Sequence, residues 1–461
     1  MWNVLGVLCG TVILAWALFI RRPSARKILS ASRWMLLSWG VLFLVHCLSP
    51  ITFYVLSVSW RAWAFSAVWV GTFVLADNIH FTFYTRPKPV PVAQQAVECS
   101  VRSMRVCAAF AVAGALLLAY THRTAYTSDN SISLITQLRN AQVSGQDSGL
   151  LNTIASALAC GGLPVTLIEV CRAVVKRSTI PLRGGFSLIA YLAVTIITGG
   201  RPGFILGTLS IIVALSASIY CSGLKFARFR KILVAGCLIT VTSICGMIYV
   251  TSSRTSGFTG DTDRKIELLN RLLATDIDPG FRDSLRPFGV FGDSVIEMFY
   301  CLGTQFASID STLRYYQGPY GFGLVDLPFL TRRLESISGI VLAEPLNDAN
   351  NRMFEKIGVW PHFFTSAAAL TVEDFGVVLS IPFVFLCGVL SWQARFRALQ
   401  SQTPFSIALQ ALICSGAAWT IIMSPSDEQT WAFPLMWFIL IYVVHRITAF
   451  FQEPLRSVRK I

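Results

Sequence analysis

Long apolar stretches alternate with short polar ones along the chain, and this pattern predicts its architecture. A helix needs about 20 apolar residues to cross a hydrocarbon core of about 30 Å, and its backbone must be hydrogen-bonded internally there. The stretches that meet this requirement run approximately over 2–20, 34–56, 62–84, 104–120, 150–171, 184–200, 203–221, 232–251, 371–392, 403–423 and 431–450. The pattern therefore predicts an all-α polytopic membrane protein with about eleven transmembrane helices.

One polar segment is much longer than every other connection. Residues 252–370 separate the first eight predicted spans, within 1–251, from the last three, within 371–461. Residues 263–274 have their apolar side chains on one helical face, which predicts a helix lying on the membrane. Residues 286–308 are apolar but interrupted, so we expect them to dip into the bundle or to rest at its interface with lipid.

The distribution of charge orients these spans. The chain is 54% hydrophobic and 13% charged, whereas soluble proteins carry about a quarter charged residues, so the composition argues against a water-soluble enzyme. The net charge is +14, and 23 of the 38 Lys and Arg residues fall in the loops 21–33, 85–106, 172–183, 222–231, 393–402 and 445–461. The positive-inside rule then predicts an N-terminus outside the cytoplasm, a cytoplasmic C-terminus and a long segment 252–370 outside. Because most of the positive charge serves orientation, nucleic-acid binding loses its support.

The turn between the sixth and seventh predicted spans carries the first candidate chemistry. It reads ITGGRPGF over 197–204 and has almost no length between two apolar stretches. Gly200 and Gly203 allow close backbone approach, and Pro202 suits the first turn of a helix, which leaves Arg201 beside a helix N-terminus. A guanidinium at a positive dipole end predicts an anion site. The alternative is an interfacial arginine that reaches toward lipid phosphate.

The long segment carries further candidates. Tyr315 and Tyr320 offer ring faces of the kind that stack on sugars, and Arg314 and Arg332 offer forked donors suited to phosphate oxygens. The alternative for the tyrosines is anchoring at headgroup depth. His362 lies near the end of the segment, at a depth where a base could act on a hydroxyl; a packed or interfacial histidine is the alternative.

Three short strings carry a family resemblance: the turn Gly199-Gly200-Arg201-x-Gly203, the Tyr320-Gly321 stretch with the Pro–Arg element after it, and Asp374-Phe375-Gly376 at the start of the ninth predicted span. With the span layout, they make the chain resemble the bacterial polysaccharide repeat-unit polymerases, the Wzy or O-antigen polymerase-like family.

The resemblance implies a GT-C-like, metal-independent glycosyltransferase of the bacterial inner membrane. Such a polymerase moves a growing glycan from undecaprenyl pyrophosphate onto an incoming lipid-linked oligosaccharide repeat unit at the periplasmic face, in O-antigen, capsule or exopolysaccharide biosynthesis. It uses no cofactor besides that lipid carrier, and it works beside a flippase and a chain-length regulator. By analogy, Arg201, Arg314 and Arg332 would grip the pyrophosphate, and His362 would be the general base.

Other functions remain open on the sequence alone. An O-antigen ligase would use the same donor and the same arginines. A flippase or other transporter is disfavoured because we find neither a mid-membrane carboxylate nor an internal repeat. A metal-dependent transferase is disfavoured because the first outer loop, 57–61, has no acidic residue. The D-x-D strings at 261–263 and 276–278 are interpreted as solvated surface rather than metal ligands.

Overall fold

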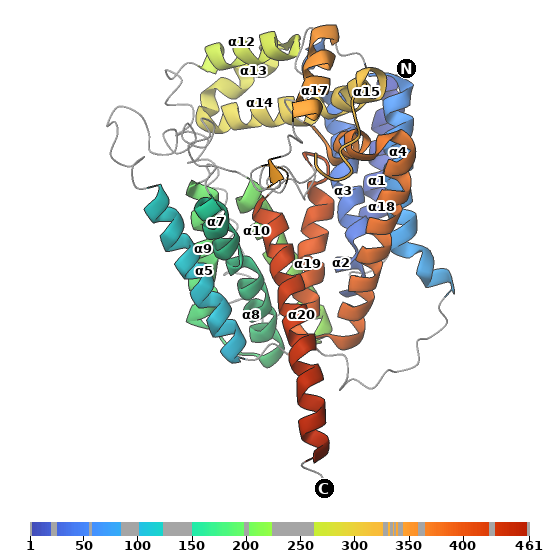
Figure 1. Ribbon diagram of the computed structural model, residues 1–461. Coiled ribbons are helices and arrows are strands. Elements are labelled where there is room, and N and C mark those ends of the chain that lie inside the picture. Colours follow the sequence, from blue (N-terminus) through green and yellow to red (C-terminus); the bar gives the residue numbers. More distant parts are fainter. Residues whose placement is uncertain are drawn as a thin grey trace.

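The chain folds into a bundle of long helices with a layer of shorter helices across one end, as the computed structural model shows (Figure 1). The structure describes residues 2–19, 25–54, 58–83, 101–122, 150–197, 202–223, 262–325, 331, 335, 338–339, 344–357, 365–423 and 429–458. The short-helix layer, called the cap layer below, comes from residues 262–357 of the long polar segment. The opposite end of the bundle, where the C-terminal helix emerges, is called the far end.

The bundle matches most of the predicted spans. Its helices are α1 (Trp2–Phe19), α2 (Ala25–Ile28), α3 (Ala31–Leu48), α4 (Trp60–Phe83), α5 (Val101–Thr121), α7 (Leu150–Cys160), α8 (Gly162–Lys176), α9 (Leu182–Ile197), α10 (Pro202–Cys221), α18 (Ala367–Ser401), α19 (Pro404–Trp419) and α20 (Gln429–Val458). Within the described ranges, five segments are long and apolar enough to cross a membrane, namely α3, α5, α7 with α8, α10 and α18. Three shorter apolar helices, α9, α19 and the first part of α20, accompany them. The predicted span 232–251 lies outside the described residues.

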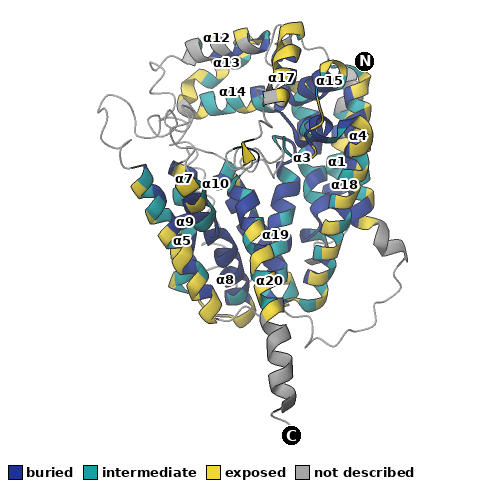
Figure 2. Cartoon of the chain, in the orientation of Figure 1, coloured by how far each residue is buried: buried dark blue, intermediate teal, exposed yellow. Residues whose placement is uncertain are grey.

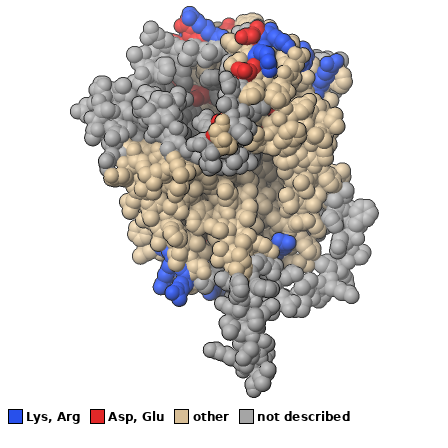
Figure 3. Space-filling model, in the orientation of Figure 1, with Lys and Arg blue, Asp and Glu red and all other residues tan. Residues whose placement is uncertain are grey.

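Burial and charge follow the expectations for a membrane body. The inward faces of the bundle helices are buried, while apolar side chains such as Leu116 on α5 and Val378 on α18 are exposed on the outside (Figure 2). On the face that Figure 3 shows, the charged side chains of the described residues gather at the two ends of the molecule and leave an uncharged belt between them. Since exposed apolar belts of this kind are stable only in lipid, the chain is a mostly helical membrane protein.

The cap layer is a small folded unit with its own core. It consists of α12 (Thr262–Leu273), β2 (Thr275–Ile277), α13 (Pro279–Leu285), the 3₁₀ turn η4 (Arg286–Phe288), α14 (Val290–Gly303), α15 (Gln305–Tyr315) and α17 (Glu344–Ile357). The apolar face of α12, made of Ile266, Leu269 and Leu273, is buried in one cluster with Ile296 and Tyr300 of α14. The prediction that this face lies on the membrane is therefore wrong, because protein covers it.

A two-stranded sheet joins the cap layer to the bundle. Strand β1 (Ile51–Phe53) pairs antiparallel with β2, with Ile51 opposite Ile277 and Phe53 opposite Thr275. The hydropathy pattern extends the second span to residue 56, and this prediction is wrong because α3 ends at Leu48. Pro50 cannot continue a helix, and the β-branched residues after it favour an extended strand.

The apolar stretch 286–308 is predicted either to dip into the bundle or to rest at its interface with lipid, and its C-terminal part dips into the bundle. The ring of Phe306, at the start of α15, stacks on Trp63 of α4 with centroids 4.5 Å apart and meets Phe43 of α3 edge-on at 4.9 Å. The carbonyl oxygen of Gly303 lies 3.0 Å from Nδ1 of His46, in the last turn of α3. The corner between α14 and α15 therefore lies at the depth of the last turns of α3.

Candidate functional site

Polar and aromatic residues of the cap layer converge on the cap-side end of α18. The chain leaves α15 through residues 315–325, called the tyrosine turn below, and this turn lies against the first part of α18. The backbone N–H of Phe322 donates to the carbonyl oxygen of Asp374 at 2.9 Å, and the N–H of Val325 donates to the Asp374 carboxylate at 2.9 Å. Asp374 is fully buried, so this carboxylate fixes the turn on the helix.

A break in α18 makes room for this contact. Gly376 has φ 70° and ψ 170°, a conformation that is accessible almost only to glycine, and it interrupts the helix there. The ring of Tyr320 lies directly over it, because a Cβ atom added at Gly376 would be 2.8 Å from Tyr320 Cζ. The Asp374-Phe375-Gly376 string thus positions the tyrosine turn through a buried carboxylate and a backbone break.

Arg314 is held in place by a buried carboxylate. Its Nε atom lies 2.8 Å from Oδ2 of Asp310, one turn earlier in α15. The second oxygen, Oδ1, accepts a hydrogen bond from the hydroxyl of Ser59, just before α4. The Asp310 side chain is 4% exposed and that of Arg314 is 32% exposed. Because a guanidinium has five N–H donors, Arg314 is oriented by Asp310 and still has donors for an external anion.

Three aromatic rings of this region face outward. Tyr315 is 38% exposed, Tyr320 51% and Phe322 71%. Tyr316 is different, because its hydroxyl donates to the carbonyl oxygen of Pro319 at 2.8 Å. Burial, followed by the nearby charges of Glu373 and Asp374, raises the pKa of the Tyr316 phenol above its usual value. The tyrosine turn therefore presents ring faces on a backbone that is fixed underneath.

The second candidate region is the start of α10. Pro202 is the first residue of that helix, which confirms the sequence prediction for its position. The hydroxyl of Tyr191 on α9 donates toward the carbonyl oxygens of Gly203, at 2.9 Å, and of Thr430 on α20, at 3.1 Å. A Cβ atom at Gly203 would lie 2.3 Å from Oγ1 of Thr195, so only glycine fits at this crossing. Gly203 thus joins α9, α10 and α20.

Four of the predicted site residues lie outside the described residues: Gly200, Arg201, Arg332 and His362. Of the others, Arg314 and Tyr315 lie at the end of α15 and Tyr320 lies over Gly376 of α18, whereas Gly203 lies at the crossing of α9, α10 and α20. The proposed roles of all eight residues stay predictions.

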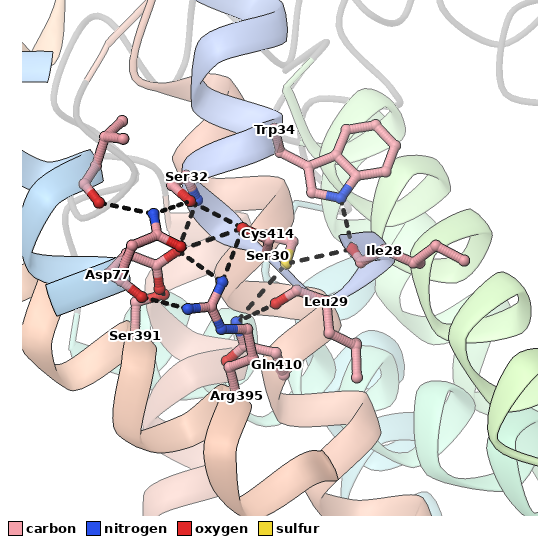
Figure 4. A network of polar contacts seen from close by, with 12 residues as sticks. Ile28, Leu29, Ser30, Ser32, Trp34, Asp77, Ser391, Arg395, Gln410 and Cys414 are labelled. Atoms are coloured by element: carbon pink, nitrogen blue, oxygen red, sulfur yellow. Dashed lines mark hydrogen bonds and ion pairs between the residues drawn. The ribbon is translucent and has the colours of Figure 1, made fainter. Parts of the chain in front are cut away.

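A second polar cluster lies near the far end of the bundle (Figure 4). Asp77 of α4 and Arg395 of α18 are 3.1 Å apart and are almost fully buried. The guanidinium also donates to the hydroxyl of Ser30 at 2.8 Å and to the backbone carbonyl of Asp77. The Asp77 carboxylate accepts from the backbone N–H of Ser32 and the hydroxyl of Ser391. Hydrogen bonds and one ion pair within this network thus join α3, α4 and α18.

The position of Arg395 shows that the predicted end of the ninth span is wrong. The hydropathy pattern ends the ninth span at residue 392 and counts Arg395 with the loop 393–402, but α18 continues to Ser401. The pattern failed because an ion pair, rather than apolar side chains, completes this helix interface. Asp310 was also missed; its spacing of four residues from Arg314 on a helix was the available signal.

No three His, Cys, Asp or Glu side chains gather to hold a metal ion in the part of the chain that the structure describes. Comparison with family models, with characterised proteins and with solved structures gives no match.

Proposed function

We propose that this protein is an integral-membrane glycan polymerase. It would transfer a growing glycan from undecaprenyl pyrophosphate onto an incoming lipid-linked oligosaccharide repeat unit. The observation that carries this proposal is the end of α15 and the turn after it, in a polar layer above a membrane bundle. There the buried Asp310 orients Arg314, and the rings of Tyr315 and Tyr320 are exposed. A diphosphate and a sugar are the two parts of such a substrate, and a guanidinium and an aromatic face are suited to bind them.

For this reaction the protein has to orient the two substrates, stabilise negative charge and provide a base. The acceptor hydroxyl oxygen forms a bond to the anomeric carbon of the donor, and the bond from that carbon to the phosphate oxygen breaks. The diphosphate leaves with the bonding electrons, so its negative charge grows in the transition state, where arginine donors stabilise it. We assign this role to Arg314 together with Arg201 and Arg332. The hydroxyl proton goes to a base, for which His362 is the candidate.

The finer features of the fold and location belong to the same proposal. We propose eleven spans in a GT-C-like arrangement in a bacterial inner membrane, with the cap layer and active site periplasmic. The N-terminus would be periplasmic and the C-terminus cytoplasmic. The Lys and Arg residues near the far end support this orientation through the positive-inside rule (Figure 3). Partners of the same pathway would be a flippase and a chain-length regulator, and the product would be O-antigen, capsule or exopolysaccharide.

An O-antigen ligase is the first alternative, because it would use the same donor and the same residues. A flippase is the second. The buried Asp77–Arg395 pair is a charged group inside the bundle of the kind that transporters use, but its hydrogen bonds to Ser30, Ser32 and Ser391 favour a structural role.

Deletion of the gene, followed by analysis of the surface glycan, separates these functions. A polymerase predicts single repeat units in place of long chains. Unattached long chains would indicate a ligase, and loss of lipid-linked repeats outside the cytoplasm would indicate a flippase. Complementation with Arg201→Ala then tests the site. If this variant inserts normally and still makes long chains, Arg201 is not part of the pyrophosphate site.

A further inference from the structure

Helix α14 carries an apolar strip that the core of the cap layer does not use. Phe291, Val295, Met298 and Leu302 recur at intervals of four, three and four residues, which places them on one helical face. Phe291 is 54% exposed and Met298 48%, and Phe288 of the preceding η4 turn is 62% exposed. Exposed side chains of this size need an explanation when they gather on one face.

The other faces of α14 are already accounted for. Ile296 and Tyr300 point into the cap-layer core together with the apolar face of α12. Asp293 and Glu297 lie on a further face, roughly opposite the strip by their helical positions. The strip is therefore a separate surface of an amphipathic helix.

The depth of the helix indicates what covers the strip. Its C-terminal end is fixed at the level of the last turn of α3 by the contact between Gly303 and His46, at 3.0 Å. Leu302, on the same face as the strip, is buried in the main core of the bundle. From that end, α14 runs across the bundle rather than along it (Figure 1). The face that meets the bundle at Leu302 thus continues toward Phe291 at the depth where the membrane spans end.

We propose that this strip, Phe288, Phe291, Val295 and Met298, lies in the lipid interface of the cap-side leaflet. The occupants are the upper acyl chains and glycerol region of phospholipids, into which an interfacial helix sinks its apolar face by about 5–10 Å. The strip thereby holds the cap layer down on the membrane. This inference does not depend on glycan transfer.

Photocrosslinking in the full-length protein tests the proposal. A benzophenone-bearing amino acid replaces Phe291 or Met298, one position at a time, and the protein is irradiated in phospholipid vesicles. Leu116, exposed on span α5, is the lipid-facing reference, and Asp283, exposed on α13, is the water-facing reference. Gel filtration before irradiation selects protein that elutes as the wild type does.

The expected result is a phospholipid adduct at both strip positions, with a yield within a few-fold of that at Leu116 and well above that at Asp283. A yield as low as that at Asp283 would overturn the proposal. So would adducts that form mainly with another segment of the chain or with a second protein, because either would mean that protein covers the strip.

Discussion

The two ends of α18 hold buried carboxylates in opposite ways. Near the far end, Asp77 meets a buried cation, Arg395, at 3.1 Å, and serine groups complete the network. At the cap end, Asp374 accepts from the backbone of the tyrosine turn, and Arg314, in the helix before this turn, keeps a side chain that is 32% exposed. The two ends are about 20 positions apart, which is about 30 Å of helix and thus about the thickness of a hydrocarbon core.

This difference suggests different roles for the two ends of α18, one in stability and one in substrate contact. A buried ion pair that is surrounded by hydrogen-bonding groups of the protein fixes the packing of helices and presents little to a ligand. The cap end instead uses its buried carboxylates, Asp310 and Asp374, to hold an arginine and a set of aromatic rings that face outward. We therefore assign stability to the far end and substrate contact to the cap end, and the following changes test that assignment.

Removal of Arg395 has the largest expected effect on stability. Arg395→Ala leaves Asp77 buried without its cation, which costs about 3–5 kcal/mol when one partner of a buried pair is removed. Thermal unfolding in detergent measures the loss. Arg397→Ala is the matched control, because Arg397 lies two residues later in the same helix and is exposed. Equal melting temperatures for the two variants would contradict a stabilising role of the pair.

Removal of Arg314 is expected to lower activity more than stability. Arg314→Ala is expected to lower glycan elongation about 10- to 100-fold, the equivalent of one charge-assisted contact. Its melting temperature should fall less than that of Arg395→Ala, because the Arg314 side chain is 32% exposed and Asp310 keeps its hydrogen bond from Ser59. Chain-length analysis of the surface glycan in the complemented deletion strain measures this effect, with Arg397→Ala again as control. Wild-type chains at equal expression would exclude Arg314 from the site.

Substitution of Gly376 affects the shape of the cap end. Gly376→Ala forces a non-glycine residue into a conformation with φ 70° and brings Cβ within 2.8 Å of the Tyr320 ring. The expected cost is about 1–3 kcal/mol of stability. In Gly185→Ala, by contrast, the new Cβ meets nothing within 4 Å, so the melting temperature should be unchanged or slightly raised. A fully stable Gly376→Ala protein would show that the break in α18 is not required.

The smallest expected effect is a pH dependence at Tyr316. Since burial raises its pKa above the ordinary 10.0, the neutral phenol contributes stability that is complete below pH 10 and is lost as the pH rises through the higher folded value. Absorbance titration of the folded protein should therefore show that Tyr316→Phe removes a phenolate that forms above pH 10. If the lost component titrates below pH 10, the assigned environment of Tyr316 is wrong.

Hydropathy and helix-start signals predicted much of the helical bundle. The features that they missed depend on contacts between residues far apart in the sequence. Hydropathy predicted the bundle, and Pro202 correctly predicted the start of α10. The strand at Ile51–Phe53 was missed because its partner lies more than 200 residues later. Arg395 was assigned to a loop because its partner, Asp77, lies on another helix. The role of Asp374 in fixing the tyrosine turn likewise depends on a contact with Val325, which periodicity does not show.

The most direct test of the central claim is elongation by the purified protein. Full-length protein in phospholipid vesicles is supplied with lipid-linked repeat units isolated from the deletion strain, without added metal or nucleotide sugar. The account predicts glycans of several repeat units together with free undecaprenyl pyrophosphate from the wild type and Arg397→Ala, and about 10- to 100-fold less of both from Arg314→Ala. Repeat units that stay single in the presence of folded wild-type protein would contradict it.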